Sequence, residues 1–579
     1  MKSHIAWRDL TPRIDTRNLI ILSAAMVIFI FLVQGNAGFM LQDEGFLWYG
    51  TIRTALGEVP LRDFQSYDPG RYYWGALWFK LLHSDGILAL RVSQAVFQFL
   101  GLTVAFLLLR RILRNWLPVI AAAGLLLIWM FPPMKIYEPV ITIAAVYFAV
   151  LLMESPSKVR HFIAGAFVGL AAFFGRNHGL YCFVASLLLI LFIWWKINRR
   201  ALIGRLAAWS LGIVIGYLPM LLMLAFIPGF FGSFVDAISF NLHQGTNLPL
   251  PVPWPWVPNY SVLSARDSFH AFSVGMLYIT LPLLYVVAGA TLFLKSKLRN
   301  NTLLTACIFV GAAYVHYDFV RPHLYYLAWT IPPFLLGLIA FPSSFSGRYK
   351  KSVTVFVWSF LLVISWTAGE MAPENYFLIK GRAWAKAKLM GRYHGDVGLA
   401  MQDYLLVETD IRGDKLWITN EIAKTVNNVK VLNNDLIPAS DHILVAPYWT
   451  ALYPILQKPS PLWEIYFLFP QSLNKQQGMV EDLEGKHVNW AIVCDFYLDD
   501  RPELAFRKTH GYVWQYLVAN FETIETDQTR SLPCGCELLH RIAPLSRLPL
   551  QPGKTLAPGM RVSRSLNKKL TSLRSGLRF

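Results

Sequence analysis

Two adjacent carboxylates, Asp43 and Glu44, follow closely on an apolar run that can cross a membrane. A carboxylate held at a membrane surface can accept a proton from a hydroxyl, so the pair is a candidate for general acid–base chemistry. The structural alternative is that both acids lie at the start of a surface helix, where negative charge is favoured. If the pair acts on a substrate, side chains from elements later in the chain must lie next to it.

The loop that holds the acid pair, residues 35–86, predicts two short helices joined by a turn. The stretch "DEGFLWYGTIRTALGE" has apolar residues at helical spacing, and "YYWGALWFKLL" is a second apolar stretch. Neither is long enough to span a bilayer, so we expect both to lie at the membrane surface with their aromatic side chains toward lipid. Between them "SYDPGRYYW" supplies Asp68, Arg71, Tyr72 and Tyr73.

The composition places most of the chain in a membrane. Of its 579 residues, 55% are hydrophobic and 15% are charged, whereas soluble proteins carry about 25% charged residues. The net charge of +18 would suggest nucleic acid in a soluble protein, but much of the Lys and Arg stands in short loops between apolar runs. That placement is typical of membrane orientation. We see no helix-turn-helix pattern, zinc finger or arginine-rich array, and expect no nucleic-acid partner.

The apolar runs predict a polytopic α-helical membrane protein of about 11–13 spans. Candidate spans lie near residues 18–35, 87–109, 117–132, 137–153, 161–176, 179–196, 206–228, 270–294, 302–319, 323–341 and 352–369. Basic clusters follow every second run, including Arg110 and Arg111, Lys158 and Arg160, and Lys350 and Lys351. By the positive-inside rule these loops and the N-terminus are cytoplasmic, which puts the acid pair and the C-terminal third outside.

We therefore predict a transmembrane domain over residues 1–370, a small extracytoplasmic α/β domain over 371–545, and a disordered basic tail over 546–579. Strand-like stretches such as "KLWIT" and "NWAIVCDF" alternate with helical ones in the second part. Cys182 and Cys307 lie in apolar runs and are predicted to be inert. A disulfide from Cys494 to Cys534 or Cys536 is compatible with an extracytoplasmic domain.

The motif "QDEGFLWYG" after the first span, followed by "YDPGRYYWG", resembles the first extracytoplasmic loop of GT-C glycosyltransferases. The likeness is to the protein O-mannosyltransferase and lipid A aminoarabinose transferase group, and it extends to the layout of about a dozen spans followed by a small α/β domain. "APYWTALYPILQKPSP" also looks like a stretch common in soluble domains of bacterial relatives. The "DPG" departs from the Pro-Pro or His-Pro of many relatives, which leaves substrate contacts there open.

The resemblance implies transfer of a sugar from a polyprenyl-phosphate carrier to an acceptor hydroxyl. Asp43 is then the predicted general base, because the family places its base on the first acid, and Glu44 assists it or positions the acceptor. Direct displacement would invert the anomeric carbon. Groups at the outer ends of the spans would bind the substrates and stabilise the departing phosphate. The predicted substrate- and phosphate-binding residues are Asp68, Arg71, Tyr72, Lys135, Glu138, Arg176, His178, Arg321 and His323.

Among these cations Arg176 and Arg321 are the preferred phosphate contacts, and several candidates have alternatives. Glu138 could pair with Lys135 or act as a second acid, and His178 could be a packed core histidine. "HYDFVRPH" lacks a fixed metal-ligand spacing, so we expect no metal and no cofactor, although some GT-C enzymes use a divalent ion. The aromatic residues of "LPLPVPWPWVPNY" could form an interface belt or a lid over the sugar.

The likeness further implies a bacterial inner membrane, undecaprenyl phosphate as the carrier, and membrane lipid around the chain. Protein, lipid A, cell-wall glycan and glycolipid remain open as acceptors. Two other functions compete. A transporter or lipid flippase would place ionisable residues near mid-membrane and often contain internal repeats, whereas here they gather at one face. A non-catalytic scaffold would not need acids and cations on that face.

Overall fold

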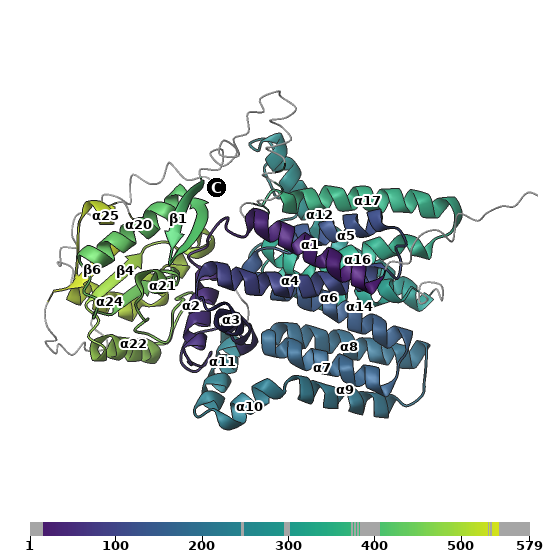
Figure 1. Cartoon of the computed structure of the whole chain (residues 1–579), viewed down its shortest axis with the longest axis horizontal. Helices are drawn as coiled ribbons and strands as arrows, with labels where there is room; N and C mark the ends of the chain where they lie inside the picture. The colour runs from purple at the N-terminus through teal and green to yellow at the C-terminus, as the bar shows by residue number, and fades with distance from the viewer. Residues whose placement is uncertain are drawn as a thin grey trace, which may run out of the picture.

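The fold is taken from a computed structural model, which describes residues 15–244, 248–294, 301–371, 375, 378, 381, 406–530, 532 and 535–542. The predicted basic tail, residues 546–579, lies outside the described residues. Figure 1 shows a bundle of long helices beside a smaller domain that contains the strands, with α2 and α3 between them.

Seven helices in the described part are long and apolar enough to cross a membrane. They are α1 (Thr16–Gln34), α4 (Ile87–Leu109), α6 (Tyr137–Glu154), α8 (Arg176–Lys196), α12 (Ala265–Leu294), α14 (Thr302–Val320) and α17 (Gly347–Gly369). Two bent pairs raise the count to nine if each is one span. They are α9 (Leu202–Gly216) with α10 (Leu218–Phe226), bent by 54°, and α15 (Leu324–Thr330) with α16 (Pro332–Ala340), bent by 56°.

The prediction of 11–13 spans therefore exceeds what length and composition support in the described residues. All eleven predicted spans overlap helices, but two of these helices are short: α5 (Trp116–Trp129) has 14 residues and α7 (Lys158–Phe174) has 17. A span needs roughly 20 apolar residues. Helix α5 stops just before a Pro pair, Pro132 and Pro133, because proline cannot continue a helix ladder.

Glycines line a close contact between α7 and α9. A Cβ at Gly165 would lie 2.0 Å from the backbone oxygen of Trp209, and one at Gly216 would lie 1.9 Å from the backbone oxygen of Ala166. Gly169 and Gly212 are equally crowded, so each helix presents two glycines four residues apart. Small residues at this spacing let membrane helices approach closely, and Figure 1 shows α7, α8 and α9 side by side.

The smaller domain contains a hairpin and a four-stranded sheet, which confirms a small α/β domain. The hairpin pairs β1 (Leu406–Ile411) with β2 (Asp414–Thr419). The sheet has the order β3-β4-β6-β5, with β3 (Ile443–Ala446) parallel to β4 (Trp490–Cys494) and with β6 (Cys536–Arg541) antiparallel to both β4 and β5 (Phe521–Thr523). Its larger helices are α20 (Asn420–Asp435), α22 (Leu473–Gly485) and α24 (Gly511–Asn520).

The cysteines follow one of the predicted alternatives. Cys494 on β4 is bonded to Cys536 on β6, while Cys534 lies outside the described residues. Cys182 and Cys307 are free and buried, as predicted.

The two short helices of the first loop form as predicted, but the surroundings of the first helix differ from the prediction. They are α2 (Asp43–Ala55) and α3 (Pro69–Leu82). The aromatic residues Phe46, Trp48 and Tyr49 of α2 are buried, and they pack against protein instead of lipid. Tyr49 stacks on Tyr453 of the smaller domain, and a Cβ at Gly45 would lie 2.5 Å from the Cβ of Ala451. The aromatic residues of α2 recur at helical spacing because they contact this distant segment of the chain. The spacing alone cannot distinguish such a contact from contact with lipid.

Candidate functional site

Asp43 is the first residue of α2 and lies where the helical bundle meets the smaller domain. It is half-buried, and its Oδ1 accepts a hydrogen bond of 2.9 Å from the hydroxyl of Tyr466. Burial first, and then the negative charge of Asp43, raise the pKa of Tyr466 well above 10.0, so this hydroxyl stays protonated as a donor. Among the described residues no Lys or Arg forms an ion pair with Asp43. The carboxylate is therefore held in place without being neutralised.

Tyr466 is itself fixed by the first loop. The side chain of Gln65 accepts hydrogen bonds from the backbone N–H groups of Ile465, at 3.1 Å, and Tyr466, at 2.8 Å, and donates one to the carbonyl of Tyr466. The ring of Phe46 also lies 5.3 Å from that of Tyr466. Residues some 400 positions apart thus form one rigid junction.

Glu44 points into a different environment from its neighbour. Its carboxylate forms a two-bond ion pair with Arg91 on α4, at 2.7 and 2.9 Å, and both side chains are buried. Arg91 also donates to the carbonyls of Gly35 and Gly38, at 2.8 and 2.6 Å. This arrangement holds the connection between α1 and α2, so the structure gives Glu44 a positioning part beside Asp43. The sequence interpretation did not pair these two residues.

Asp68 and Arg176 lie together, although 108 residues separate them in the chain. The Asp68 carboxylate forms an ion pair with the side chain of Arg176 at 2.7 Å and accepts a hydrogen bond from its backbone N–H at 2.8 Å. Because Asp68 precedes α3 and Arg176 begins α8, the pair joins two helix starts. One atom of Arg176, Nη1, is buried without a hydrogen-bond partner in the described part.

Arg71 and Glu138 form a second buried ion pair, at 2.6 Å, and Arg71 also donates to the carbonyl of Phe174 at 2.7 Å. Burial works to lower the pKa of Arg71, but the Glu138 carboxylate outweighs it and the pKa is raised. Glu138 therefore pairs with Arg71 and not with Lys135. Tyr72 is fully buried, and its hydroxyl accepts from the backbone N–H of Tyr67 at 3.1 Å.

Lys135 is the one of the predicted cations that has no carboxylate partner in the described residues. Its ammonium donates to the Tyr67 hydroxyl at 2.6 Å and lies 3.9 Å from the centre of that ring. Burial and then the negative charge of Asp43 raise the pKa of Tyr67 well above 10.0, so Lys135 faces a neutral hydroxyl. A buried ammonium without a counter-ion favours an anionic ligand.

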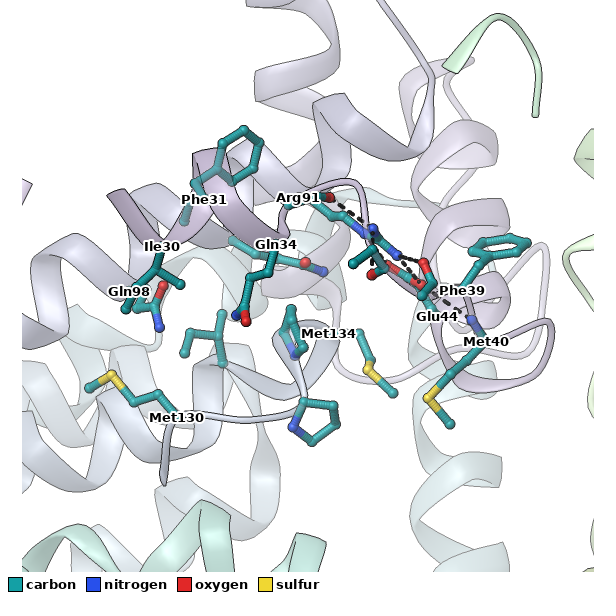
Figure 2. Close-up of a pocket in the computed structure, with 18 residues that line it drawn as sticks. Ile30, Phe31, Gln34, Phe39, Met40, Glu44, Arg91, Gln98, Met130 and Met134 are labelled. Atoms are coloured by element: carbon teal, nitrogen blue, oxygen red, sulfur yellow. Dashed lines mark hydrogen bonds and ion pairs between the residues drawn. The ribbon is translucent and has the colours of Figure 1, made fainter. Parts of the chain in front are cut away.

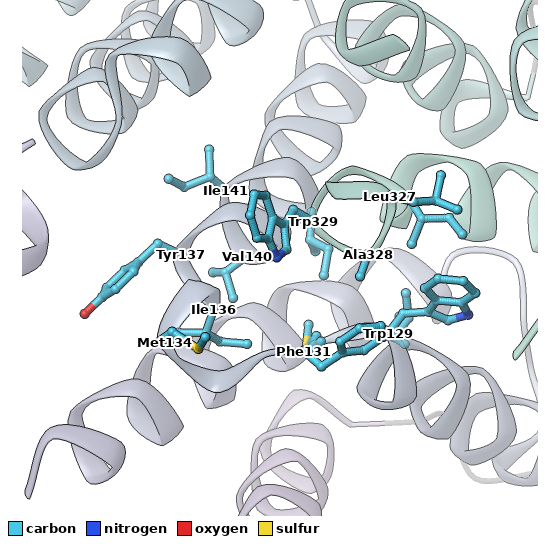
Figure 3. Packing of buried hydrophobic residues seen from close by; sticks show 14 of the residues in the cluster. Trp129, Phe131, Met134, Ile136, Tyr137, Val140, Ile141, Leu327, Ala328 and Trp329 are labelled. Carbon is cyan, nitrogen blue, oxygen red and sulfur yellow. The ribbon is translucent and has the colours of Figure 1, made fainter. Parts of the chain in front are cut away.

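The segment that carries Lys135 is held by a tightly packed core. Figure 3 shows Met134 and Ile136, on either side of Lys135, packed near Phe131 and Val140. Trp329 of α15 lies against the same cluster, and its ring centre is 5.6 Å from the Lys135 ammonium. The apolar neighbours thus fix the backbone from which this cation projects.

Arg321 ends α14 and reaches the smaller domain. Its guanidinium pairs with Asp499 at 2.7 Å and donates to the carbonyl of Leu248 at 2.8 Å. His323 precedes α15, and its Nδ1 accepts from the backbone N–H of Tyr325. His178 is buried, with its Nδ1 3.2 Å from the Tyr314 hydroxyl. His323 therefore has the contacts of a helix cap, and His178 has those of a packed core residue.

The structure brings part of the predicted set around one point. Tyr326 on α15 lies within electrostatic reach of Asp43, Lys135, Arg321 and Tyr67. Tyr67 is likewise within reach of Asp43 and of the Arg71–Glu138 pair. His178 contacts Tyr314 and lies within electrostatic reach of Glu138, Arg71 and Lys135. The arrangement is a carboxylate facing a cluster of cations and tyrosine hydroxyls.

Sequence reasoning missed four residues of this cluster: Tyr67, Arg91, Tyr466 and Asp499. Tyr67 stands inside the quoted motif "SYDPGRYYW" and could have been found there. Tyr466 and Asp499 come from the distant domain and carry no local signal. Among the described residues no group of three or more His, Cys, Asp or Glu side chains could hold a metal ion, and the expected absence of a metal stays a prediction.

No protein-family model and no curated protein matches the sequence. The structure is similar to that of ArnT from Cupriavidus metallidurans bound to undecaprenyl phosphate, with 14% identity, a TM-score of 0.50, and coverage of 90% of this chain and 98% of that one. It is also similar to apo ArnT (13% identity, TM-score 0.49, 90% and 97% covered) and to the Archaeoglobus fulgidus oligosaccharyltransferase AglB (11%, 0.43, 83% and 69%). The near-complete likeness to ArnT confirms the predicted fold, a GT-C-like helical membrane protein with a small C-terminal domain.

Proposed function

We propose that this protein is a membrane glycosyltransferase that moves a sugar from a polyprenyl-phosphate donor to an acceptor hydroxyl. The observation that carries the proposal is the un-neutralised carboxylate of Asp43, held by Tyr466, together with the buried cation Lys135, which has no counter-ion in the described part. Tyr67 accepts from Lys135 and lies within electrostatic reach of Asp43, so the two charged groups are near one another. A base and a nearby cation are what sugar transfer from a lipid phosphate requires. The fold shared with a protein that binds undecaprenyl phosphate supports the choice of donor.

In the proposed reaction the acceptor oxygen attacks the anomeric carbon of the donor sugar. Its proton passes to the carboxylate of Asp43 as the new carbon–oxygen bond forms. The bond from the anomeric carbon to the phosphate oxygen breaks, and its electron pair leaves with the lipid phosphate. A single displacement of this kind inverts the anomeric carbon. Tyr466 orients the carboxylate through its hydrogen bond to Oδ1, which leaves the other carboxylate oxygen for the acceptor.

Lys135 is the preferred phosphate contact in this account. It is buried, and the only hydrogen bond of its ammonium in the described part goes to the neutral Tyr67 hydroxyl. Arg321 can join it, because a phosphate could share or replace its contact with Asp499. Arg176 and Arg71 are committed to Asp68 and Glu138, and we assign them to positioning the helix starts.

We further propose that Asp43 and the smaller domain lie on the extracytoplasmic face of a bacterial inner membrane. The contacts of Asp68 with Arg176, Arg71 with Glu138 and Arg321 with Asp499 gather the predicted outer ends together. Arg111 and Arg160, from loops predicted to be cytoplasmic, both lie near Glu154 instead. The basic loops at that end support a cytoplasmic orientation for it. Undecaprenyl phosphate is the proposed carrier.

The function is tested by supplying the purified protein in liposomes with undecaprenyl-phosphate sugars and an extract of bacterial envelope as acceptor. Released undecaprenyl phosphate is then measured by mass spectrometry. We expect release that depends on both the donor and the extract. If no donor is consumed while a solute or lipid crosses the liposome membrane, the protein is a transporter or flippase and the proposal is wrong.

A further inference from the structure

A cavity of about 70 Å³ that is open to the exterior lies between α1, α4 and the connection from α5 to α6. Neither Asp43 nor Lys135 is among its lining residues. Figure 2 shows Gln98, Ile30 and Met130 at one end, Gln34 and Met134 near the middle, and the Arg91–Glu44 ion pair with Met40 at the other end. A space of this size can admit one polar group of a larger molecule that extends out through the opening.

Gln94, on α4, is the unusual residue of this cavity. It lines the space, its side chain is only 2% exposed, and neither its amide nitrogen nor its amide oxygen has a hydrogen-bond partner in the described residues. A buried amide without a partner is costly, and native proteins rarely keep one without a reason. Gln98 lines the same space one helical turn further along α4.

The charge of the cavity limits what it can bind. Its only ionisable lining residues are Arg91 and Glu44, which neutralise each other, and Arg91 is further engaged by the carbonyls of Gly35 and Gly38. The rest of the lining is apolar or amide, including Ile30, Met130 and Ile136. A phosphate would find no free cation here, whereas an uncharged carbonyl or hydroxyl would satisfy Gln94.

The helix that forms one wall of the cavity has an apolar outer face. Helix α1, which forms one wall, leaves Ile28, Phe29 and Leu32 exposed at 57%, 63% and 76%. Such a face belongs against acyl chains in a membrane protein. An isoprenoid chain has no polar atoms below its phosphate and cannot satisfy an amide. A lipid with an ester, amide or hydroxyl group near its head can do so.

From this geometry we propose that the cavity between α1 and α4 binds an acylated membrane lipid, with an uncharged ester, amide or hydroxyl group hydrogen-bonded to Gln94. Two sources share this chemistry: a bilayer phospholipid held permanently, and the acceptor itself. The second source rests on the proposed function. It is favoured by position, because the lining residues Glu44 and Met134 are the chain neighbours of Asp43 and Lys135.

The binding test uses the full chain purified in detergent, with retained lipids identified and titrated by native mass spectrometry. The probes are palmitoyl-oleoyl phosphatidylethanolamine, which carries two acyl ester groups, and undecaprenyl phosphate, which carries no acyl ester. We expect Gln94→Leu to weaken retention of acylated lipid about tenfold, the loss of roughly one hydrogen bond. Binding of undecaprenyl phosphate should stay within about twofold of the wild type.

Two further variants test whether the loss of lipid retention is specific to the cavity and is not caused by misfolding. Gln98→Leu changes the same cavity one turn away and should also weaken lipid retention. Thr103→Val is the matched control, because Thr103 lies on the same helix with an unpartnered buried hydroxyl but does not line the cavity.

After delipidation, Gln94→Leu should melt at a higher temperature than the wild type, since it removes a buried unpaired amide. A purely structural role for Gln94 predicts the opposite shift.

The outcomes separate the possibilities. If Gln94→Leu weakens undecaprenyl phosphate binding as much as acylated lipid binding, the cavity holds the donor chain and the inference is overturned. Unchanged retention in both glutamine variants would also overturn it. A retained lipid that gains a sugar when donor is supplied is the acceptor, and one that stays unmodified while donor is consumed is a resident lipid. If the wild type consumes no donor, the proposed function fails while the binding result stands.

Discussion

At the scale of single residues, Asp43 and Lys135 differ from the other candidates in having no oppositely charged partner in the described part. Arg71, Arg176 and Arg321 each pair with a carboxylate. Lys135 instead donates to the Tyr67 hydroxyl. Breaking a paired charge mainly costs stability, whereas removing an unpaired cation mainly costs ligand binding. The residue types alone could not make this distinction.

Lys135→Gln should lower kcat/KM for the lipid-phosphate donor by about 10- to 100-fold, the effect of one charge-assisted contact to a phosphate. The protein should remain folded, because the variant removes a buried charge that has no counter-ion and its amide can still donate to the Tyr67 hydroxyl. Steady-state kinetics with a varied donor measure the effect. Lys80→Gln is the control, since Lys80 is an exposed cation of α3 in the same loop. A large loss of melting temperature with unchanged kcat/KM would argue against a phosphate role.

The buried tyrosines Tyr67 and Tyr466 predict how stability depends on pH. Burial raises the pKa of both well above 10.0. Above pH 10 the unfolded chain loses these protons while the folded protein keeps them, so stability falls as pH rises. Tyr466→Phe removes one such group and should lose less melting temperature between pH 9 and pH 11 than the wild type. An equal or greater alkaline loss in the variant would contradict this assignment.

At the scale of elements, α2 is the helix on which the site depends. Its N-terminus presents Asp43, its next residue ties it to α4 through Glu44 and Arg91, and its aromatic residues pack on the smaller domain. The sequence predicted the helix and its start correctly. It placed the aromatic side chains against lipid, because a stripe of Phe, Trp and Tyr has the same spacing whether it contacts lipid or a distant protein surface.

Arg91→Met should destabilise the protein by about 3–5 kcal/mol, since it leaves the Glu44 carboxylate buried without its partner. The double variant Glu44→Met with Arg91→Met should recover much of that stability, because both charges are then gone. Melting temperature and donor turnover are measured on both. If turnover recovers together with stability, Glu44 is a positioning residue. Recovery of stability without turnover would assign Glu44 a direct part in the reaction.

Gly45→Ala should lower turnover at least about tenfold by shifting the smaller domain away from α2. The added Cβ would lie 2.5 Å from the Cβ of Ala451 and 2.6 Å from its backbone nitrogen. That shift would move Tyr466 away from Asp43, and displacements of about 1 Å can cost on the order of 100-fold in rate. Gly124→Ala on α5 is the control, because nothing lies within 4 Å of its added Cβ. Full turnover in Gly45→Ala would contradict this prediction, because activity would then survive a shift of the smaller domain away from α2.

At the scale of the whole molecule, the sequence predicted the helices well and the partners poorly. Every predicted span overlaps a helix or a bent helix pair, because hydropathy and charge act locally. The pairs that build the site join residues 67, 108 and 423 positions apart: Arg71 with Glu138, Asp68 with Arg176, and Asp43 with Tyr466. Such pairings depend on how the helices and the smaller domain pack, which no local pattern records.

The central claim is that Asp43 is the general base of a glycosyltransferase, and one comparison of rates tests it most directly. Asp43→Asn keeps the size of the side chain and its contact with Tyr466 but cannot accept the acceptor's proton. Release of undecaprenyl phosphate should fall about 100- to 10,000-fold in this variant, with donor binding retained. The exposed Asp267→Asn serves as the matched control and should be unchanged. Full turnover by Asp43→Asn would contradict the account.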